Sequence, residues 1–189
     1  MKLVLMRHGL PDYDLSQRVA GLNLSRAYAA YKNAGLAAGN VIPEKSLAVA
    51  TECQWRVTSE LFRATESLRL MNLPADYSDV LFNESEPPHV NVPFPALPLM
   101  LWATVFRGAS ILGFSPNGEA QADLKLREQA ASLQLQRWSE EYGSVLLLGH
   151  GFMNYLLGKA LRRDGWVCVE ETGYRHWSYR TYRLIGEFS

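Results

Sequence analysis

The chain has 189 residues, a length that indicates one domain with a core of useful size. Hydrophobic residues make up 48% and charged residues 20%, which is the balance of an ordinary globular protein. The formal net charge is zero, so nothing points to nucleic-acid binding through bulk positive charge. Any anion site must therefore come from a local group of arginines.

Cysteine content and hydropathy indicate the cellular compartment of the protein. Cys53 and Cys168 lack metal-site spacing and are too few for a disulfide framework, so we interpret them as free thiols in a reducing compartment. The N-terminal segment reaches Arg7 too early for a signal peptide. The most apolar stretch, 90–114, contains three prolines and Arg107, which argues against a membrane span. We expect a cytoplasmic protein with no membrane partner.

Short apolar runs mark the expected strands. Runs bounded by turn residues predict buried strands at 3–6, 55–58 and 145–148, with a further candidate at 77–82. Residues 179–185 alternate between apolar and polar types, which predicts a closing strand at an edge of the sheet.

Helical spacing and turn residues mark the expected helices. Ser59 is expected as the N-cap of a helix over 60–68, and residues 43–50 begin a second short segment. The remaining helices are predicted at 15–36, 99–112, 119–142 and 151–163.

The order of these elements predicts the fold class. Strands separated by helices indicate a mostly parallel sheet with helices on both faces. We therefore expect an α/β three-layer sandwich, formed by one domain over residues 1–189. Residues 85–118 are proline-rich, aromatic and apolar, and we interpret them as a covering or lid insertion. The same apolar segment could form a dimer surface, so a homodimer stays open.

Two histidines follow predicted strands. The tripeptide Arg7-His8-Gly9 ends the first strand, and His150 lies between two glycines after the strand at 145–148. In open α/β sheets the C-terminal edge of the strands is where ligands bind. Two strand-end histidines, one beside an arginine, indicate phosphate chemistry on histidine.

Two more strand ends add polar residues to the same edge. Ser59 follows the strand at 55–58, and Arg63 lies one helical turn later. Glu84 comes at the end of the run Val80-Leu81-Phe82-Asn83-Glu84. Two arginines, two histidines and one carboxylic acid are therefore expected to converge above one sheet.

In this order the motifs resemble those of the histidine phosphatase superfamily, also called the phosphoglycerate mutase-like family. Arg7-His8-Gly9 matches the family signature, and residues 59–64 with Ser67 are similar to its second motif. Residues 148–151 are similar to its last motif, and residues 82–84 to the segment that supplies its proton donor. The resemblance covers most of the chain and implies a phosphoglycerate mutase-like fold.

These residue types suit phosphoryl transfer. Arg7 and Arg63 offer planar, bidentate donors for phosphoryl oxygens. His8 is expected as the nucleophile, with its other ring nitrogen held by a backbone carbonyl, and the adjacent arginines disfavour its charged form. Glu84 is expected to protonate the leaving oxygen and then to take a proton from water. His150 is expected to hold a phosphoryl oxygen and to stabilise growing charge, and no metal or other cofactor is expected.

The assignment of the proton donor leaves one alternative open. Glu86 lies two residues from Glu84, and Glu84 is preferred because it follows the strand more directly and fits the family spacing. Arg107 is the other arginine best placed to reach a substrate, although a structural role is favoured. His89 and His176 show no ligand spacing and are given no role.

The chain departs from the mutases of the family just after the signature. Leu10 and Pro11 stand where an acidic residue and a serine or threonine are usual, and Asp14 stands where an asparagine often follows. A carboxylate close to a phosphate is repulsive unless it is paired or kept distant. Sugar-phosphate mutase activity is therefore disfavoured.

The expected function is a metal-independent phosphatase that hydrolyses a phosphomonoester through a phosphohistidine on His8. Its partner would be a small phosphorylated substrate or a phosphoprotein, and the apolar covering segment favours a partly apolar substrate. One alternative is a phosphoglycerate mutase-like phosphotransferase. Another is a non-catalytic protein that binds a phosphorylated ligand.

Overall fold

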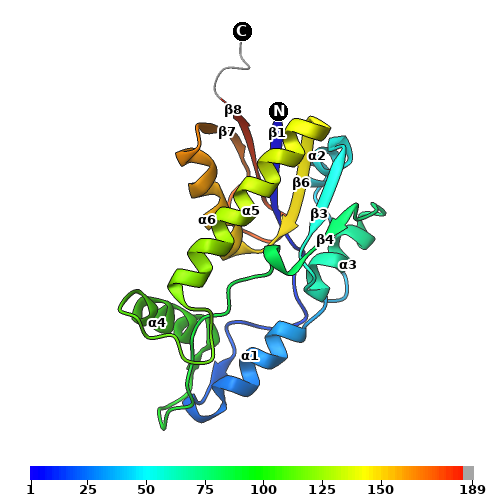
Figure 1. Ribbon diagram of the computed structural model, residues 1–189. Coiled ribbons are helices and arrows are strands. Elements are labelled where there is room, and N and C mark those ends of the chain that lie inside the picture. The colour runs from blue at the N-terminus through cyan, green and yellow to red at the C-terminus, as the bar shows by residue number, and fades with distance from the viewer. Residues whose placement is uncertain (185–189) are drawn as a thin grey trace.

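The computed structural model describes residues 1–184 as a central sheet flanked by helices, with a smaller part containing α1 and α4 at one end (Figure 1). The strands are β1 (Lys2–Arg7), β2 (Arg18–Val19), β3 (Trp55–Thr58), β4 (Tyr77–Ser78), β5 (Leu97–Pro98), β6 (Ser144–Gly149), β7 (Trp166–Glu171) and β8 (Tyr179–Leu184). The α-helices are α1 (Leu24–Asn33), α2 (Glu44–Glu52), α3 (Phe62–Leu70), α4 (Leu99–Ile111), α5 (Gln121–Tyr142) and α6 (Gly151–Arg163). Two 3-10 helices are η1 (Gly21–Asn23) and η2 (Val80–Phe82).

The main sheet has the strand order β4-β3-β6-β1-β8-β7. Strands β4, β3, β6 and β1 are parallel, and β8 and β7 add an antiparallel pair. In the central pair, Arg7 of β1 is in register with Gly149 of β6. His8 directly follows β1 and His150 directly follows β6, so this register brings both histidines to the same edge of the sheet.

The two faces of β1 follow the period-2 alternation of a strand. Leu3 and Leu5 pack into a core that includes residues of α5 and α6, and Val4 and Met6 pack into a second core with residues of α2 and α3. All four side chains are buried, and this burial on both faces explains why the sequence of the strand is a continuous apolar run. The predicted three-layer α/β sandwich with a mostly parallel sheet is confirmed.

A smaller third core lies apart from the sheet. Leu24 and Ala27 of α1 pack there with Leu99, Trp102 and Phe106 of α4. A short β2–β5 ladder joins the same two chain segments. This smaller part therefore contains residues of the N-terminal segment 13–31 as well as residues of the segment 85–118. The covering role of 85–118 stays a prediction.

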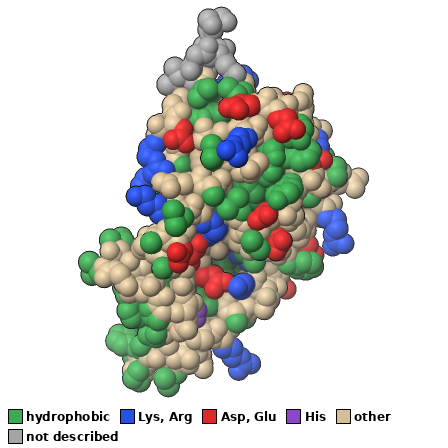
Figure 2. Space-filling model, in the orientation of Figure 1, with side chains coloured by type: hydrophobic (Ala, Val, Ile, Leu, Met, Phe, Trp, Pro, Cys, Tyr) green, Lys and Arg blue, Asp and Glu red, His purple; other side chains and the backbone are tan. Residues whose placement is uncertain are grey.

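The outer face of α4 is apolar. Leu101, Val105 and Ile111 are exposed there, and hydrophobic side chains gather in this part of the molecule at the lower left of Figure 2. No helix among residues 1–184 is both long enough and apolar enough to span a membrane. The homodimer stays a prediction, since the structure describes one chain.

The predicted helix at 15–36 was wrong in its first half. The α-helix begins only at Leu24, after β2 and η1. Gly21 donates its N–H to the Phe94 carbonyl and accepts from the Val92 N–H, both at 3.1 Å. A Cβ at Gly21 would lie 2.4 Å from the Val92 carbonyl oxygen. This long-range backbone pairing overrides the local helical spacing.

The other corrections concern boundaries and edges. The predicted strand at 77–82 is only β4, because Asp79 accepts from the Leu81 N–H and caps η2. Helix α3 begins at Phe62 rather than at Glu60, so Ser59 is not its N-cap. The closing strand β8 lies inside the sheet, because the unforeseen β7 forms the edge. The predicted strand end at residue 185 lies outside the described residues.

We expect the shortening of a buried side chain in the central strand β6 to destabilise the fold strongly. Leu147 of β6 is fully buried, so Leu147→Ala should lower the free energy of unfolding by about 2–5 kcal/mol through lost burial and a residual cavity. Leu126→Ala on the exposed face of α5 is the matched control and should change stability by less than about 0.5 kcal/mol. Urea unfolding measures both, and equal losses would contradict this account of the core.

Candidate active site

The end of β1 holds His8 in a buried position. The His8 N–H donates to the Gly149 carbonyl at 3.0 Å, and the Trp177 N–H donates to the His8 carbonyl at 3.3 Å. The next residue, Gly9, donates its N–H to Ser67 Oγ at 2.9 Å. Three different segments therefore fix the backbone around this histidine, whose side chain is 1% exposed.

The hydrogen bonds of His8 select one tautomer. Its Nδ1 lies 2.7 Å from the Gly9 carbonyl oxygen, and since a carbonyl can only accept, Nδ1 carries the proton. The other nitrogen, Nε2, accepts from Arg63 Nε at 3.2 Å. Burial, then Arg63 and Arg7, holds the pKa of His8 well below its ordinary value. His8 is therefore neutral at pH 7 with a lone pair on Nε2, as a nucleophile requires.

A tight approach explains the glycine after His8. A Cβ at Gly9 would lie 2.4 Å from the Trp177 ring and 2.7 Å from Asn40 Oδ1. Asn40 in turn accepts from the Trp177 indole N–H at 3.1 Å and from the Leu10 N–H at 2.7 Å. Any larger residue would push this packed indole away from the His8 backbone.

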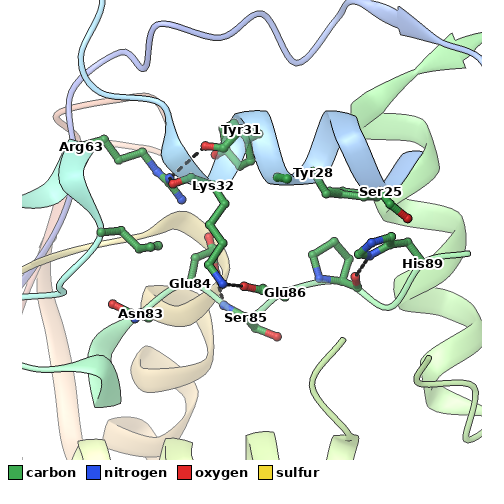
Figure 3. A pocket seen from close by; sticks show the side chains of 13 residues that line it. Ser25, Tyr28, Tyr31, Lys32, Arg63, Asn83, Glu84, Ser85, Glu86 and His89 are labelled. Carbon is green, nitrogen blue, oxygen red and sulfur yellow. Dashed lines mark hydrogen bonds and ion pairs between the residues drawn. The ribbon is translucent and has the colours of Figure 1, made fainter. Parts of the chain in front are cut away.

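Arg63 is positioned by the last turn of α1. Its Nη1 donates to the Tyr31 and Lys32 carbonyls at 3.2 and 3.1 Å, and its guanidinium lies 4.6 Å from the Tyr31 ring centroid (Figure 3). Arg63 is 1% exposed, and burial lowers its pKa from the ordinary value. These contacts aim its Nε–H at His8.

Arg7 lies beside the N-terminus of α6. Its Nη1 donates to the Tyr174 carbonyl at 2.8 Å, while its Nε is buried without a hydrogen-bond partner in the described part of the chain. A Cβ at Gly151 would lie 3.4 Å from that Nε, so a glycine keeps this approach open. Arg7 therefore has an unused donor in the region of His8.

His150 also has an unused ring nitrogen. Its Nε2 lies 2.6 Å from Ser59 Oγ, which also accepts from the Leu61 N–H at 3.3 Å. When the Ser59 hydroxyl donates to Nε2, the proton of His150 resides on Nδ1, which is buried and unpartnered within residues 1–184. Burial, then His8 and Arg63, holds the pKa of His150 well below its ordinary value. The imidazole centroids of His8 and His150 are 5.0 Å apart.

Glu84 accepts hydrogen bonds at the N-terminus of α6. Its Oε2 accepts from the Phe152 N–H at 3.1 Å, and its Oε1 accepts from the Met153 N–H at 3.0 Å. A carboxylate is stabilised there by the free N–H groups and the helix dipole. The charge of Glu84 also contributes to the electrostatics of Arg63 and Arg107, which places these three groups in one neighbourhood.

The loop that carries Glu84 is itself anchored. Arg127 of α5 donates to the carbonyls of Leu81 and Asn83 at 3.0 and 2.8 Å, and it pairs with both oxygens of Glu119 at 2.6 Å. Asn83 Oδ1 accepts from the Glu60 N–H at 3.0 Å. The loop is thereby tied to α5 and to the segment that carries Ser59.

Glu86, the alternative donor, lies in a different setting. Figure 3 shows its carboxylate paired with Lys32, beside Glu84. The Glu86 side chain is about half exposed. Within residues 1–184 its side chain forms no hydrogen bond or ion pair with α6 or with either histidine of the site. The structure therefore brings Glu84 closer to the predicted machinery than Glu86.

Two cavities of about 290 and 360 Å³ flank the site. Both are lined by Tyr28, Tyr31 and Glu84. The first also has Arg63 in its wall, and the second has Arg7. Tyr31 therefore lines two cavities, each of which also reaches one of the two arginines that are predicted to bind phosphate.

The residues that depart from the mutase pattern lie outside these cavities. The Asp14 carboxylate accepts from the Ser16 N–H and hydroxyl at 2.8 and 2.6 Å and is exposed. The Leu10 side chain is 51% exposed. Neither residue lines either cavity among the described residues, so Asp14 brings no carboxylate to the phosphate position.

The sequence interpretation missed His176 and Tyr31. The His176 ring centroid lies 5.6 Å from that of His8, although the two residues are distant in the chain. Neither residue carried a motif or a ligand spacing. The only signal was aromatic and histidine content in segments that the fold brings to the sheet edge.

Comparisons with known proteins find similar solved structures for this chain. No family model and no curated protein sequence matches the chain. A mycobacterial glucosyl-3-phosphoglycerate phosphatase structure is 21% identical, covers 86% of this chain and 79% of its own, and gives a TM-score of 0.54. A putative alpha-ribazole-5'-P phosphatase from Escherichia coli is 19% identical over 85% of this chain and 79% of its own, with a TM-score of 0.57.

A phosphoserine phosphatase from Entamoeba histolytica, solved with 3-phosphoglyceric acid, is 15% identical. It covers 95% of this chain and 89% of its own at a TM-score of 0.57. The chain has the phosphoglycerate mutase-like fold of these structures. Since one fold hosts several functions, the chemistry of this chain depends on the residues of its own site.

The donor set of the site is rich in cationic side chains. Within residues 1–184 no group of three or more histidine, cysteine, aspartate or glutamate side chains is arranged to hold a metal ion. Arg7 and Arg63 supply positive charge at the place where the resemblance puts the phosphoryl group. The arrangement can bind an oxyanion and present a neutral imidazole to it.

We expect the two buried histidines to make stability fall at acid pH. Each is neutral when folded and takes up a proton when unfolded below its ordinary pKa near 6.5. Each therefore lowers the free energy of unfolding by about 1.4 kcal/mol per pH unit as the pH falls below about 6.5. Urea unfolding of the wild type and His150→Gln between pH 5 and 7 measures this.

The His150→Gln variant has one histidine fewer that takes up a proton on unfolding. Its free energy of unfolding should therefore fall less steeply with decreasing pH than that of the wild type. The difference in slope should approach 1.4 kcal/mol per pH unit. Parallel curves would contradict a His150 that is neutral in the folded protein.

Proposed function

We propose that this chain is a metal-independent phosphatase of the histidine phosphatase superfamily, which hydrolyses a phosphomonoester through a phosphohistidine on His8. The observation that carries the proposal is the Nε2 lone pair of a buried, neutral His8 surrounded by Arg7, Arg63 and His150. Arg7 Nε and His150 Nδ1 are buried donors without partners among the described residues. Such groups cost about 1–3 kcal/mol each when unsatisfied, and an oxyanion would satisfy them.

The solved neighbours support a phosphatase in general terms. The three compared above are described as phosphatases of glucosyl-3-phosphoglycerate, alpha-ribazole-5'-P and phosphoserine. Each of these proteins is named after a small phosphorylated compound. The reaction class of the present chain is consistent with theirs, and its substrate is a separate question.

Substrate binding would exchange one hydrogen bond for another. A phosphoryl group carries about −1.5 to −2 charges near neutral pH. Its oxygens would accept from Arg7 Nε and His150 Nδ1 and would draw the Arg63 Nε–H away from His8 Nε2. This exchange frees the lone pair at the moment that the phosphorus atom arrives.

In the first step, His8 Nε2 would attack phosphorus in line with the ester oxygen. The N–P bond forms as the P–O ester bond breaks, and the electron pair stays on the leaving oxygen. Glu84, in its protonated form, would donate a proton to that oxygen, which leaves as an alcohol. The Nδ1–H bond to the Gly9 carbonyl stabilises the positive charge that develops on the ring.

In the second step, a water molecule would attack the phosphorus of the phosphohistidine. The P–N bond breaks, its electron pair returns to His8 Nε2, and inorganic phosphate forms. Glu84, now a carboxylate, would accept the proton from the water and so recover the form needed for the first step. Arg7, Arg63 and His150 would stabilise the charge on the phosphoryl oxygens in both steps.

We expect His8→Ala to abolish release of nitrophenol from p-nitrophenyl phosphate, because the proposed phosphohistidine forms on His8. Wild-type turnover should persist in excess chelator. Glu84→Gln should lower kcat for an alkyl phosphate by about 100- to 10,000-fold, as expected for a lost general acid. The loss on p-nitrophenyl phosphate should be smaller, because nitrophenolate leaves without a proton.

The matched controls for this prediction are two other carboxyl-to-amide changes. Glu140→Gln on the exposed face of α5 should leave both rates unchanged. A larger loss in Glu86→Gln than in Glu84→Gln would transfer the donor role to Glu86. Full phosphate binding by His8→Ala without any wild-type turnover would favour the non-catalytic alternative.

The second cavity argues for a substrate with an apolar body. Leu99, Met100, Ala103 and Phe152 contribute to its wall, and Arg107 is the cation added to Arg7. Arg107 already donates to the Ser85 carbonyl at 2.8 Å and stacks 3.8 Å from the Phe152 ring centroid. A second phosphate would therefore find few free donors there.

We expect monophosphates with an aryl or alkyl body to be preferred over small polar monophosphates by roughly tenfold or more in kcat/KM, since burying an apolar side chain-sized group contributes about 1.5–3 kcal/mol. Release of inorganic phosphate from a panel of phosphate esters measures this. A preference for bisphosphorylated or polyanionic substrates would contradict the apolar assignment without contradicting the phosphohistidine reaction.

A further inference from the structure

One histidine near the nucleophile has no role in the mechanism above. The His176 ring centroid lies 5.6 Å from that of His8, with the ring planes inclined at 38°. Its Nε2 is buried without a hydrogen-bond partner in the described part of the chain. It is thus the third such nitrogen in this neighbourhood, after Arg7 Nε and His150 Nδ1. One acceptor group could satisfy all three.

The loop that carries His176 is fastened to the end of β1. The Arg7 N–H donates to the Ser178 carbonyl at 2.9 Å, and the Trp177 N–H donates to the Arg7 carbonyl at 3.1 Å. The Tyr174 carbonyl accepts from Arg7 Nη1 at 2.8 Å. Backbone and side-chain contacts therefore fix this loop to the two residues that open the signature tripeptide.

The residue after His176 is held in an uncommon conformation. Trp177 has a φ of +64°, a left-handed value that is disfavoured for a bulky residue. Its ring is nevertheless 4% exposed and donates to Asn40. Strain of this kind persists only where the surroundings over-determine it, and it is concentrated at functional sites. Here it turns the chain so that His176 faces the His8 ring.

We infer that His176 is a further phosphate-positioning residue of the proposed phosphatase, in which its Nε2–H donates to a phosphoryl oxygen held by Arg7. The inference rests on the proposed function and deepens it.

Burial and the nearby Arg7 lower the pKa of His176 to about 4, so the imidazole is neutral at pH 7 and has one N–H to give. An oxyanion at this place selects the tautomer with that proton on Nε2. Asp14 faces solvent and bonds to Ser16, so it does not compete for the position. The donor set around the phosphoryl group then consists of two arginines and two histidines.

The test compares two variants of similar size in the full chain. His176→Leu removes the donor, while His176→Gln retains an amide N–H close to the position of Nε2. We expect His176→Leu to weaken competitive inhibition by inorganic phosphate, and to raise KM for p-nitrophenyl phosphate, by roughly 10- to 100-fold. His176→Gln should recover most of both losses.

Arg175→Ala is the matched control, because this neighbouring side chain is exposed. It should behave like the wild type in both measurements. Thermal unfolding separates a binding role from a structural one, since His176→Leu should keep its melting temperature while it loses phosphate affinity.

Three outcomes would overturn the inference. They are an unchanged phosphate inhibition constant in His176→Leu, equal losses in His176→Leu and His176→Gln, and a loss in His176→Leu that follows its melting temperature. If the wild type itself neither hydrolyses phosphate esters nor is stabilised by inorganic phosphate, the proposed function fails and this inference fails with it. Active wild type with an unaffected His176→Leu overturns the inference alone.

Discussion

The pairing of β1 with β6 brings His8 and His150, the two central histidines of the site, to the same edge of the sheet. Parallel hydrogen bonds put Arg7 opposite Gly149, and the His8 N–H then donates to the Gly149 carbonyl. A one-residue slip of this register would turn His8 to the other face of the sheet and would exchange the two cores that β1 serves. Because four consecutive residues of each strand are fully or almost fully buried, the packing on both faces opposes such a slip.

The electrostatics of the site follow from that placement. Two guanidinium groups and three imidazoles share a small, buried volume, and the nearby carboxylate of Glu84 is engaged by the first turn of α6. The pKa values of the three imidazoles are lowered there, so the imidazoles are neutral at pH 7. The result is a neutral nucleophile in a positive environment, which suits a dianionic reactant and disfavours a cation.

The sequence predicted the parts of the fold that local pattern controls. The apolar runs at 3–6 and 145–148 have no polar interruption, and the strands lie there with one or two extra residues at their ends. Helix α6 begins and ends at the predicted residues, and α4 begins at the predicted residue and ends one residue early. The segment before α1 was misread because its pairing partner, near residue 92, is distant in the chain. Strand β7 was missed because four of its six residues are exposed, so its sequence lacks a regular alternation of apolar and polar residues.

The residues of the candidate site also fall into those that the sequence predicted and those that it did not. Arg7, His8, Arg63 and His150 lie within motifs, and the structure brings them together with Glu84. Tyr31 and His176 carry no local signature, because their place depends on how α1 and the β7–β8 loop pack against the end of β1. Only tertiary contacts, such as the Trp177 N–H to the Arg7 carbonyl, bring such residues to the site.

The hydrogen bond from Arg63 to His8 Nε2 has a consequence for chemical selectivity. In this structure the lone pair that would attack phosphorus is already occupied by an arginine that two α1 carbonyls hold in place. A neutral electrophile offers that arginine nothing in exchange and meets a shielded nitrogen. An electrophile that carries anionic oxygens draws the arginine to itself and uncovers the nitrogen in the same movement. The histidine would thus be protected from adventitious alkylation and acylation by the residue that recruits its reactant.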